Sequence, residues 1–503
     1  MVAKKITTAD LQSYVDAHYT PAMVARETGL DLSNLAKRMK PLRPRELPHT
    51  VEPKNAKGYV ITSAQNGAPI HRKFFETLQA YCKRHSYNLV VIPVRYRNPT
   101  APKEAENAKN DTWASEVMPY LCSHDVDLCN GLKLMGSVPI QPTAARPLSG
   151  LDTITGEGSG IFAHPKVAFN CIATKQGKLP KLLYTTGAVT RPRYSKSKAG
   201  RKGEFHHSIS AVVVQREGDL FHMRHLHAQA DGSFYDLDCK YSGKRATKGQ
   251  KAATLTPGDI HAAEICPKTL DAICRVAKRL KPRKIVLHDV LDFGSASHHN
   301  TFFDRFRKRQ ESRDEIHAEL LETAAIVDQI AALTPMLAIV SSNHNDHFTQ
   351  WLQSDKNAND LANAWVYAET RAYYLRELME KREPVSPFEF WARRMCKKQD
   401  RIKFLGRNDS LSVLGVEHSF HGDKGPGGAR GSTMNLSKIG AKVTKGHSHS
   451  PGIIDGCYDA GTSSRLDLEY TAGSPSAWIN SMVVLYPNGK RTHVHVIDGR
   501  CGI

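Results

Sequence analysis

Features that would place the chain in a membrane or outside the cell are missing from this sequence. No stretch approaches about 18 consecutive apolar residues, the length that a membrane-spanning helix needs. The N-terminus, MVAKKITTADLQSY, lacks the apolar core of a secretory signal. The 10 cysteines include no Cys-x-x-Cys pair and no paired Cys/His knuckles, which argues against a disulfide framework and a zinc finger. We therefore expect reduced thiols, a cytoplasmic protein and no membrane partner.

Acidic residues are scarce relative to basic ones. The 503 residues hold 50 Asp and Glu against 70 Lys and Arg, a formal net charge of +20. This excess favours contact with a polyanion, with nucleic acid the first candidate; the alternative is a solvated basic surface. A composition that is 40% hydrophobic and 24% charged excludes a wholly disordered or fibrous protein. The length exceeds that of a single core, so about two to four domains are expected.

Residues 1–45 are predicted to form a small helical module. Pro21 opens a short helical pattern that ends before Gly29, and Asp31 or Ser33 can cap a second one. The spacing resembles a helix-turn-helix, whose second helix would present Lys37 and Arg38 to a DNA groove. Two short helices that simply pack together are the alternative. The proline-containing stretch that follows predicts a linker at residues 46–57.

Residues 58–250 predict an α/β domain of unknown role. The domain begins with a strand, an amphipathic helix and a buried strand, and shorter strand-like pieces follow. No Gly-rich phosphate loop follows the first strand. Residues 191–207 predict a basic loop in which Arg191 and Arg193 are candidate nucleic-acid contacts, although a solvated loop is the alternative.

Residues 251–503 carry the residues that indicate chemistry. The chain holds 24 histidines, and several of them fall in five polar groups that follow strand-like runs or, in the first case, a turn signal. In chain order the groups are Asp259 and His261; His288, Asp289 and Asp292; Asn343, His344, Asn345 and Asp346; His418 and His421; and His447 and His449. Any one of these groups is a weak signal, because a lone histidine is more often an ordinary core or surface residue.

The five groups together predict a metal site. Loops after strand ends can bring distant side chains to one edge of a sheet, where they can fix two divalent ions about 3.5–4 Å apart. A carboxylate that bridges the ions shares its charge between them. Imidazole and carboxylate ligands suit Mn, Fe, Zn or Ni better than a soft metal.

The order of the groups resembles the calcineurin-like metallophosphoesterases, which include the SbcD-type DNA repair nucleases. That family's pattern is D-x-H, G-D-x-x-D, G-N-H-D/E, a single His often followed by Gly, and G-H-x-H, and the resemblance covers roughly residues 253–495. It implies an α/β fold in which residues 251–503 form a two-sheet sandwich flanked by helices. It also implies two divalent metal ions, with Mn²⁺ first and Mg²⁺, Fe²⁺, Zn²⁺ or Ni²⁺ as alternatives.

The resemblance assigns a role to each matching residue. Asp259, His261 and His449 would bind the first metal. Asp289 would bridge the pair, and the second metal would be completed by Asn343, His421 and His447. His344 would lie beside the scissile phosphate, to stabilise charge or protonate the leaving oxygen.

Three departures from the family pattern affect these assignments. His288 stands where the family has Gly. The third motif reads S-N-H-N-D, which displaces the acidic partner of the catalytic His344 to Asp346. Both His418 and His421 could supply the fourth motif, and the His-Gly context favours His421.

Two basic segments lie between these motifs. Residues 301–333 predict one long amphipathic helix that could follow a phosphate backbone, or else be a solvated face; its candidate contacts are Arg305, Arg307, Lys308 and Arg309. The glycine-rich segment 421–432 could hold phosphate oxygens through Lys424 and Arg430, or be an ordinary turn. The runs SMVVLYP and THVHVID, joined by Asn488-Gly489, predict a closing hairpin.

The leading hypothesis for function is a metal-dependent phosphodiesterase that cuts DNA. The DNA assignment depends on the charge, the N-terminal module and the basic segments, because the motifs themselves indicate only phosphoester hydrolysis. The alternatives are a small-molecule phosphatase or cyclic-nucleotide phosphodiesterase, and a DNA-binding regulator or scaffold with a structural metal site. A homodimer would suit a duplex-binding nuclease. The resemblance also implies a phage-encoded DNA-degrading enzyme, which would act in the host cytoplasm.

Overall fold

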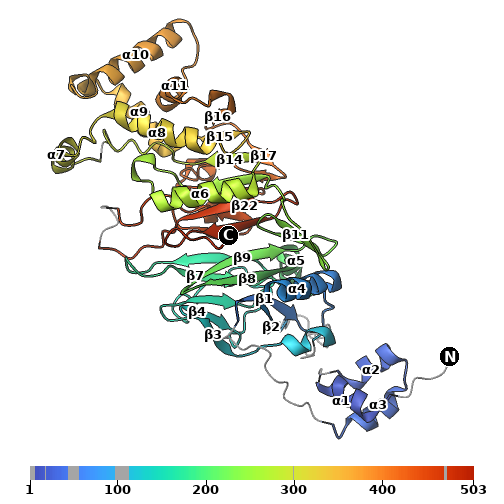
Figure 1. Ribbon diagram of the computed structural model, residues 1–503. Coiled ribbons are helices and arrows are strands. Elements are labelled where there is room, and N and C mark those ends of the chain that lie inside the picture. Colours follow the sequence, from blue (N-terminus) through green and yellow to red (C-terminus); the bar gives the residue numbers. More distant parts are fainter. Residues whose placement is uncertain (1–5, 17–18, 43–55, 97–112, 298, 469–472) are drawn as a thin grey trace.

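The protein has a mixed α/β fold, which confirms the expected class. The computed structural model describes residues 6–16, 19–42, 56–96, 113–297, 299–468 and 473–503. In these residues four β-sheets form the body of the molecule, with helices at both ends of its long axis (Figure 1). None of the described helices combines the length and the apolar character that crossing a bilayer requires.

Three short helices form the N-terminal module: α1 (Thr8–Asp16), α2 (Pro21–Thr28) and α3 (Leu32–Met39). The Thr20 side chain caps α2, Gly29 ends it with φ +73°, and Asp31 caps α3 by accepting from the Asn34 amide at 2.8 Å. Leu11, Val24 and Leu35 are buried together in a small core of the module. The two helical patterns of the sequence are thus confirmed, whereas contact with DNA stays a prediction. Most of the predicted linker, residues 46–55, lies outside the described residues.

The β-α-β unit predicted from residue 58 is present. Parallel strands β1 (Gly58–Gln65) and β2 (Asn88–Val94) are connected by helix α4 (Arg72–His85). Two long antiparallel strands complete this four-stranded sheet, β8 (Ser210–Glu217) and β9 (Leu220–His227). A small sheet follows, made of β10 (Phe234–Asp236), β11 (Cys239–Ser242) and β12 (Arg245–Thr247).

A six-stranded sheet carries the first three motif groups. In spatial order its strands are β16 (Ile402–Leu405), β15 (Leu337–Val340), β14 (Lys284–Leu287), β13 (Thr254–Pro257), β22 (Ser481–Leu485) and β23 (Arg491–His495). The strands β13 to β16 are parallel to one another. Their apolar runs are continuous because both faces are buried: Ile285 and Leu287 contact the helical layer, and Val286 faces the other way.

Helices cover one face of this sheet. They include α6 (Pro267–Leu280), α8 (Ile316–Ala331), α9 (Asn343–Gln353) and α11 (Pro387–Met395). Helix α10 (Ala364–Met379) projects at the end of the molecule opposite the N-terminal module (Figure 1). The closing hairpin is confirmed, since β22 and β23 pair antiparallel across the turn at Gly489, whose φ is +75°.

A ten-stranded sheet joins the middle of the chain to its C-terminal part. In spatial order its strands are β17 (Ser412–Val413), β18 (Val416–Glu417), β19 (Lys442–Lys445), β21 (Cys457–Asp459), β20 (Gly452–Ile454), β6 (Phe169–Ile172), β7 (Lys181–Thr185), β5 (Ser159–Phe162), β4 (Leu132–Met135) and β3 (Asp125–Cys129). The pairing of β20 with β6 connects the two parts, and Tyr184, Tyr458 and Val483 share one core. The boundary that we expected at residues 250/251 therefore does not separate two sheets.

Two segments differ from the sequence prediction. The basic stretch 191–207 is not all loop, because Ser197 caps the helix α5 (Lys198–His206) by accepting from the Gly200 amide at 3.1 Å. The single long helix expected at 301–333 is two helices, α7 (Phe302–Gln310) and α8. The break occurs at Ser312, whose φ of +55° is incompatible with a continuous helix.

A buried ion pair connects the four-stranded sheet to the C-terminus. Arg224 donates to both carboxylate oxygens of Asp236, at 2.8 and 3.1 Å, and to the carbonyl oxygen of Gly502 at 3.3 Å. Tyr81 donates to the same carboxylate at 2.8 Å. Burial alone would raise the pKa of Asp236, but the charge and hydrogen bonds of Arg224 lower it.

Replacing Asp236 by Ala is expected to lower the free energy of unfolding by about 3–5 kcal/mol, because Arg224 would remain buried without a counter-charge. Guanidinium unfolding midpoints measure this. Since the folded-state pKa of Asp236 is lowered, the pair stabilises the protein above about pH 4, and the contribution fades as the pH falls below that value. Asp127→Ala is the control, because Asp127 is exposed and lies 3.9 Å from Lys133, so its loss should cost under about 1 kcal/mol. Equal losses in the two variants would contradict the assignment.

Candidate metal centre

The five motif groups meet where strands of two sheets end. Asp259 follows β13, Asp289 follows β14, and Asn343 begins α9 after β15. Because these three strands are parallel, their carboxyl ends share one edge of the six-stranded sheet. His421 and His447 come from the ten-stranded sheet, after the parallel strands β18 and β19. Strand pairing thus brings together residues as distant in the sequence as Asp259 and His449.

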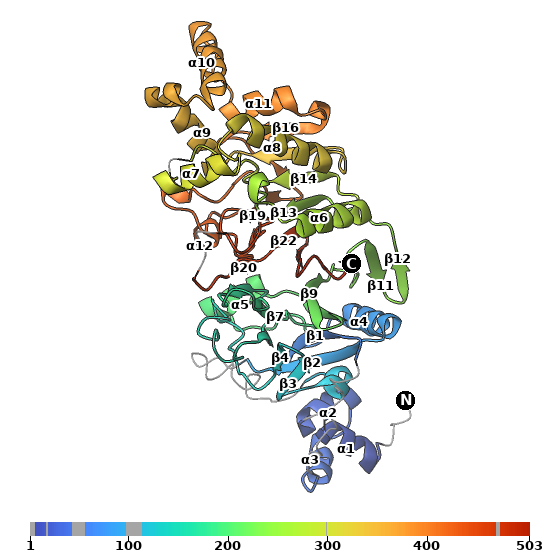
Figure 2. The same ribbon diagram turned by 60° about the vertical axis from the view of Figure 1, so that its left-hand side comes forward.

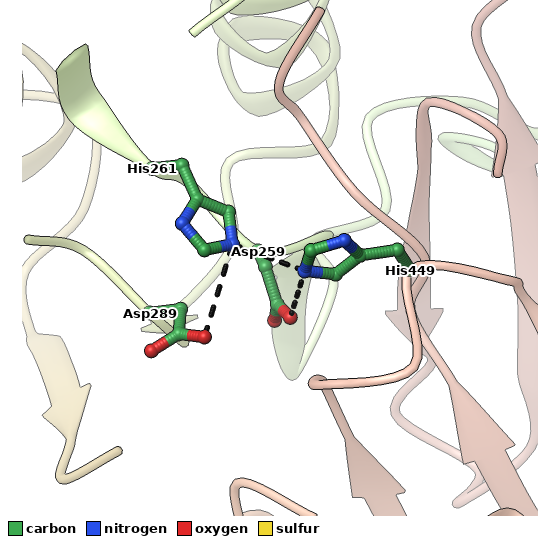
Figure 3. A group of neighbouring side chains, drawn as sticks. All are labelled: Asp259, His261, Asp289 and His449. Carbon is green, nitrogen blue, oxygen red and sulfur yellow. Dashed lines mark hydrogen bonds and ion pairs between the residues drawn. The ribbon is translucent and has the colours of Figure 1, made fainter. Parts of the chain in front are cut away.

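Four buried side chains form the first donor group, shown in Figure 3. Asp259, His261, Asp289 and His449 each offer one ligand atom, and these atoms lie within 4.8 Å of one another. Nε2 of His449 is 3.2 Å from Oδ2 of Asp259 and 3.0 Å from Nε2 of His261. Nε2 of His261 is 3.8 Å from Oδ2 of Asp289. Lone pairs of imidazoles and carboxylates that converge in this way are suited to a cation.

A second donor group shares Asp289 with the first, and a third, made of His261, Asp292 and His344, shares His261 with it. Asp289, His421 and His447 could together hold a metal ion. Nε2 of His421 lies 3.2 Å from Oδ2 of Asp289 and 3.1 Å from Oδ1 of Asn343. The structure therefore brings together all seven side chains that the sequence analysis named as ligands, with Asp289 between the first and second groups.

Asp292 orients two of the histidines. Nδ1 of His261 donates to Oδ1 of Asp292 at 2.9 Å, and Nδ1 of His344 donates to the Asp292 carbonyl oxygen at 2.7 Å. Both acceptors are oxygens, so each contact fixes Nδ1 as a proton-bearing nitrogen and directs Nε2 of the ring toward the centre. The sequence places Asp292 in the second motif group and by itself indicates no role for it. Its position three residues after Asp289 was the available signal.

The backbone is strained at four of the proposed ligands. His261, Asp289, His447 and His449 all have positive φ, of 41°, 42°, 75° and 56°. This conformation costs a non-glycine residue about 1 kcal/mol or more, and it persists where the surroundings over-determine it, which is common at functional sites. Gly446 is required for a related reason: a Cβ there would lie 2.0 Å from Oδ1 of Asp259.

Two buried carboxylate oxygens of the centre lack hydrogen-bond partners among the described residues. Oδ1 of Asp259 and Oδ1 of Asp289 are buried, and neither has a hydrogen-bond partner among the described residues. Burial would raise the pKa of both carboxyl groups, yet the nearby histidines lower both. For His261, burial would lower the pKa, but its hydrogen bond to Asp292 and the surrounding carboxylates raise it to about 9. The site thus favours positive charge beside its carboxylates, and this donor set fits a divalent cation.

His418 and His288 lie behind the donors rather than among them. His418 is buried with Nδ1 3.5 Å from the hydroxyl of Thr256, and it belongs to none of the donor groups. His288 stacks on His421 with ring centroids 5.8 Å apart. Burial lowers the pKa of each of these two rings to about 3, so both are neutral. Of the two candidates for the fourth motif, the geometry favours His421.

Asp346 does not contact His344 as the sequence analysis expected. Its carboxylate accepts from Arg407 at 2.8 Å, and the same guanidinium donates to Asp423 at 2.7 Å. Asp346 lies in the first turn of α9 and Asp423 lies two residues after His421, so Arg407 connects the loops of the third and fourth motifs. No sequence pattern indicated Arg407. Asp292 takes the orienting role that we had given to Asp346.

Replacing Arg407 by Met is expected to reduce metal affinity by roughly 10- to 100-fold, the range found when residues that support metal ligands are removed. Both Asp346 and Asp423 would lose their counter-charge, and the loops that carry Asn343 and His421 would no longer be held together. Calorimetric titration with Mn²⁺ measures the effect. Arg382→Met, which removes an exposed arginine paired with Glu377 at 2.7 Å, should leave metal affinity unchanged. If the Arg407 variant binds Mn²⁺ normally, the arginine does not position the ligands.

An open cleft of about 830 Å³ leads to the centre. Asp289, Asn343, His344, His447 and His449 lie at its base. The cationic residues along it are Lys308, Arg313 and Arg465. Sequence reasoning had not singled out Arg465, which follows no recognisable motif. The lining also holds Glu264, Asp304 and Asp467, and Arg313 is paired with Glu264, so the sides of the cleft carry charges of both signs.

The other candidate nucleic-acid contacts are spread over the molecule. Lys308 lines the cleft, and Arg305, Arg307 and Arg309 are exposed on the same helix, α7. Lys424 and Arg430 belong to an exposed loop and are not among the residues that line the cleft. Arg191 and Arg193 are exposed beside the four-stranded sheet, and Lys37 is exposed on α3. Arg38 donates to the carbonyl oxygen of Ile6 at 2.9 Å, so its charge is partly used within the module.

Comparison with known proteins identifies a relative in a phage. The chain is 31% identical over 474 residues to Protein A1 of Escherichia phage T5, and the alignment covers 89% of this chain and 83% of that protein. The chain belongs to the Protein A1 family. A relative in a phage is consistent with the phage origin that the sequence resemblance implied. No family model and no solved structure matches the chain, so membership of the metallophosphoesterases stays a prediction for this member of the Protein A1 family.

Proposed function

We propose that the protein is a dinuclear-metal phosphodiesterase that cuts DNA. The observation that carries the proposal is the position of Asp289, which belongs to two donor groups at the base of one cleft. A carboxylate shared in this way is what two ions about 3.5–4 Å apart require. The arrangement of donors on loops between two packed sheets also supports the sandwich fold of the calcineurin-like metallophosphoesterases for this half of the chain.

Each residue then has a defined task. Asp259, His261 and His449 would hold one ion, Asn343, His421 and His447 would hold the other, and Asp289 would be shared by both. Two divalent ions bound there, Mn²⁺ first and Mg²⁺, Fe²⁺, Zn²⁺ or Ni²⁺ as alternatives, would activate water and neutralise phosphoryl oxygens. His344 presents Nε2 to the cleft, where it can give a proton to the leaving oxygen.

DNA is the proposed substrate because of the charge of the chain and its N-terminal module. The chain carries a net charge of +20, and the module has the helix order of a helix-turn-helix.

The direct test is incubation of the purified protein with linear, circular and single-stranded DNA in Mn²⁺, with a chelator control. We expect degradation that the chelator abolishes. Digestion of linear DNA alone would indicate an exonuclease, and loss of the circle an endonuclease. If a chromogenic phosphate ester is hydrolysed and every DNA is left intact, the substrate is a small molecule and the DNA assignment is wrong.

Deleting residues 1–45 is expected to weaken DNA binding by at least roughly tenfold at moderate salt, because the basic residues of α3 would be lost. The small core of the module is largely its own, so the remaining fold should persist. Hydrolysis of bis(p-nitrophenyl) phosphate should stay unchanged, and the salt dependence of DNA binding should become shallower. An unchanged DNA affinity would show that the module has another role.

A further inference from the structure

Helix α7, which borders the cleft, presents three phenylalanines to solvent. The side chains of Phe302, Phe303 and Phe306 are 70%, 71% and 55% exposed. No residue of α7 is buried. Figures 1 and 2 show the helix at the margin of the molecule, outside the helical layer that covers the six-stranded sheet. A group of exposed aromatic rings on one short helix indicates an interaction surface rather than part of a core.

The rings do not hold the helix in place. A nine-residue helix is marginal by itself, and α7 depends on contacts at its other face. Thr301 and Asp304 form a capping box at its start, and Lys308 donates to the carbonyl oxygen of Gly294 at 2.5 Å and to Asn300 at 2.9 Å. The phenylalanines can therefore contact a ligand without loss of structure.

Helix α7 borders the metal cleft. Asp304 and Lys308, one turn apart, line the same cleft as Asp289 and His344. Phe302 and Phe306 are also one turn apart and share another face of the helix, which does not line the cleft. The same helix carries three exposed arginines, Arg305, Arg307 and Arg309. Aromatic rings beside guanidinium groups are the combination that binds bases and phosphates of an unpaired strand.

We propose that α7 is a base-stacking platform for an unpaired nucleic-acid strand whose backbone enters the metal cleft. This inference rests on the proposed function and narrows its substrate to nucleic acid with unpaired bases near the scissile phosphate. A closed duplex hides the faces of its bases and would leave the rings without a partner. A second copy of the chain suits this surface poorly. In a symmetric contact through α7, the four basic residues of one helix would lie next to the same four residues of the other helix. Each helix has one acidic residue to offset this repulsion.

The test compares three probes of equal length, each bound in the presence of a chelator so that no cleavage occurs. The probes are single-stranded oligothymidylate, the same backbone with abasic sites, and a hairpin-capped duplex. The variant Phe302→Ala/Phe306→Ala is compared with the natural protein. We expect it to bind oligothymidylate roughly tenfold or more weakly, in line with the loss of one or two stacked bases, and to bind the abasic strand and duplex within about twofold of normal.

Two further variants show whether the rings themselves are required. Phe205→Ala removes a phenylalanine that is 84% exposed on α5, a helix whose residues do not line the metal cleft, and should change no affinity. Phe302→Leu/Phe306→Leu keeps apolar side chains without rings and should behave like the alanine variant. Equal weakening on all three probes, no weakening on any, or leucines that restore binding would overturn the stacking proposal. A smaller size in solution for the alanine variant would assign the face to a second copy.

This result is separable from the proposed function. Hydrolysis of bis(p-nitrophenyl) phosphate should be the same in the alanine variant and the natural protein, because Phe302 and Phe306 are not among the residues that line the cleft. If no phosphodiester is hydrolysed by the natural protein in any divalent metal, the proposed function fails. The binding comparison in chelator still decides whether α7 stacks bases.

Discussion

Hydrolysis of phosphodiesters is expected to fall by at least roughly 10³-fold when Asp289 is replaced by Asn, because the substitution removes the one carboxylate common to the first and second donor groups. Oδ2 of Asp289 lies 3.2 Å from Nε2 of His421 and 3.8 Å from Nε2 of His261, so an amide in its place would lose the charge that holds both sides together. Rates with bis(p-nitrophenyl) phosphate and with DNA measure the loss.

Metal binding provides an independent readout of the same variant. The natural protein should be stabilised against heat by Mn²⁺, since binding to the folded state alone raises stability with ion concentration. The Asp289→Asn variant should lose most of this stabilisation and bind fewer ions per chain. Asp355→Asn is the matched control, because Asp355 is 86% exposed beside Arg371 and belongs to none of the donor groups. A near-normal rate of hydrolysis after the Asp289 substitution would contradict the two-metal proposal.

Replacing His344 by Ala is expected to lower the rate on DNA by roughly 10²–10⁴-fold while the bound metal is retained. The His344 ring is held through Nδ1 by the Asp292 carbonyl oxygen, and Nε2 is 3.8 Å from Oδ2 of Asp289, at the open side of the centre. A proton given to the leaving oxygen matters most when that oxygen is strongly basic. The loss should therefore be much smaller for a p-nitrophenolate leaving group than for a deoxyribose oxygen.

Comparison of the two substrates distinguishes an acid from a ligand. Equal losses on both substrates together with loss of Mn²⁺ from the His344 variant would show that the residue is a metal ligand. His347→Ala supplies the matched control, since His347 also lies on α9 and lines the cleft but belongs to none of the donor groups. It should retain most of the activity on both substrates.

Much of the centre could be predicted from the sequence because its donors lie directly after strands. Asp259, Asp289 and Asn343 follow apolar runs that form parallel strands, and the carboxyl ends of such strands meet at one edge by geometry alone. The same local logic predicted the first β-α-β unit and the closing hairpin. The prediction of one helix over residues 301–333 was wrong. The break at Ser312 falls within a continuous amphipathic pattern, and such a pattern does not reveal a residue with φ of +55°.

Contacts between loops could not be predicted in this way. Asp346 was paired with His344 because the two are near in sequence, whereas helix α9 turns the carboxylate toward Arg407, 61 residues away. The role of Asp292 depends on the positions of His261 and His344 around it. The exposure of Phe302, Phe303 and Phe306 is equally a property of the whole fold, since the same residues on a packed helix would be core.

The amino-acid sequence was sufficient to predict the types and order of the proposed ligands, the basic character of the chain and the strands that carry the ligands. These are local properties, set by composition and by the alternation of apolar runs with polar ends. Three facts needed the folded chain: Asp289 lies between two donor groups, His421 rather than His418 approaches it, and one ten-stranded sheet spans both sides of residue 250. Each of these facts depends on contacts between segments that are distant in the sequence, either within one sheet or between two, which no local pattern encodes.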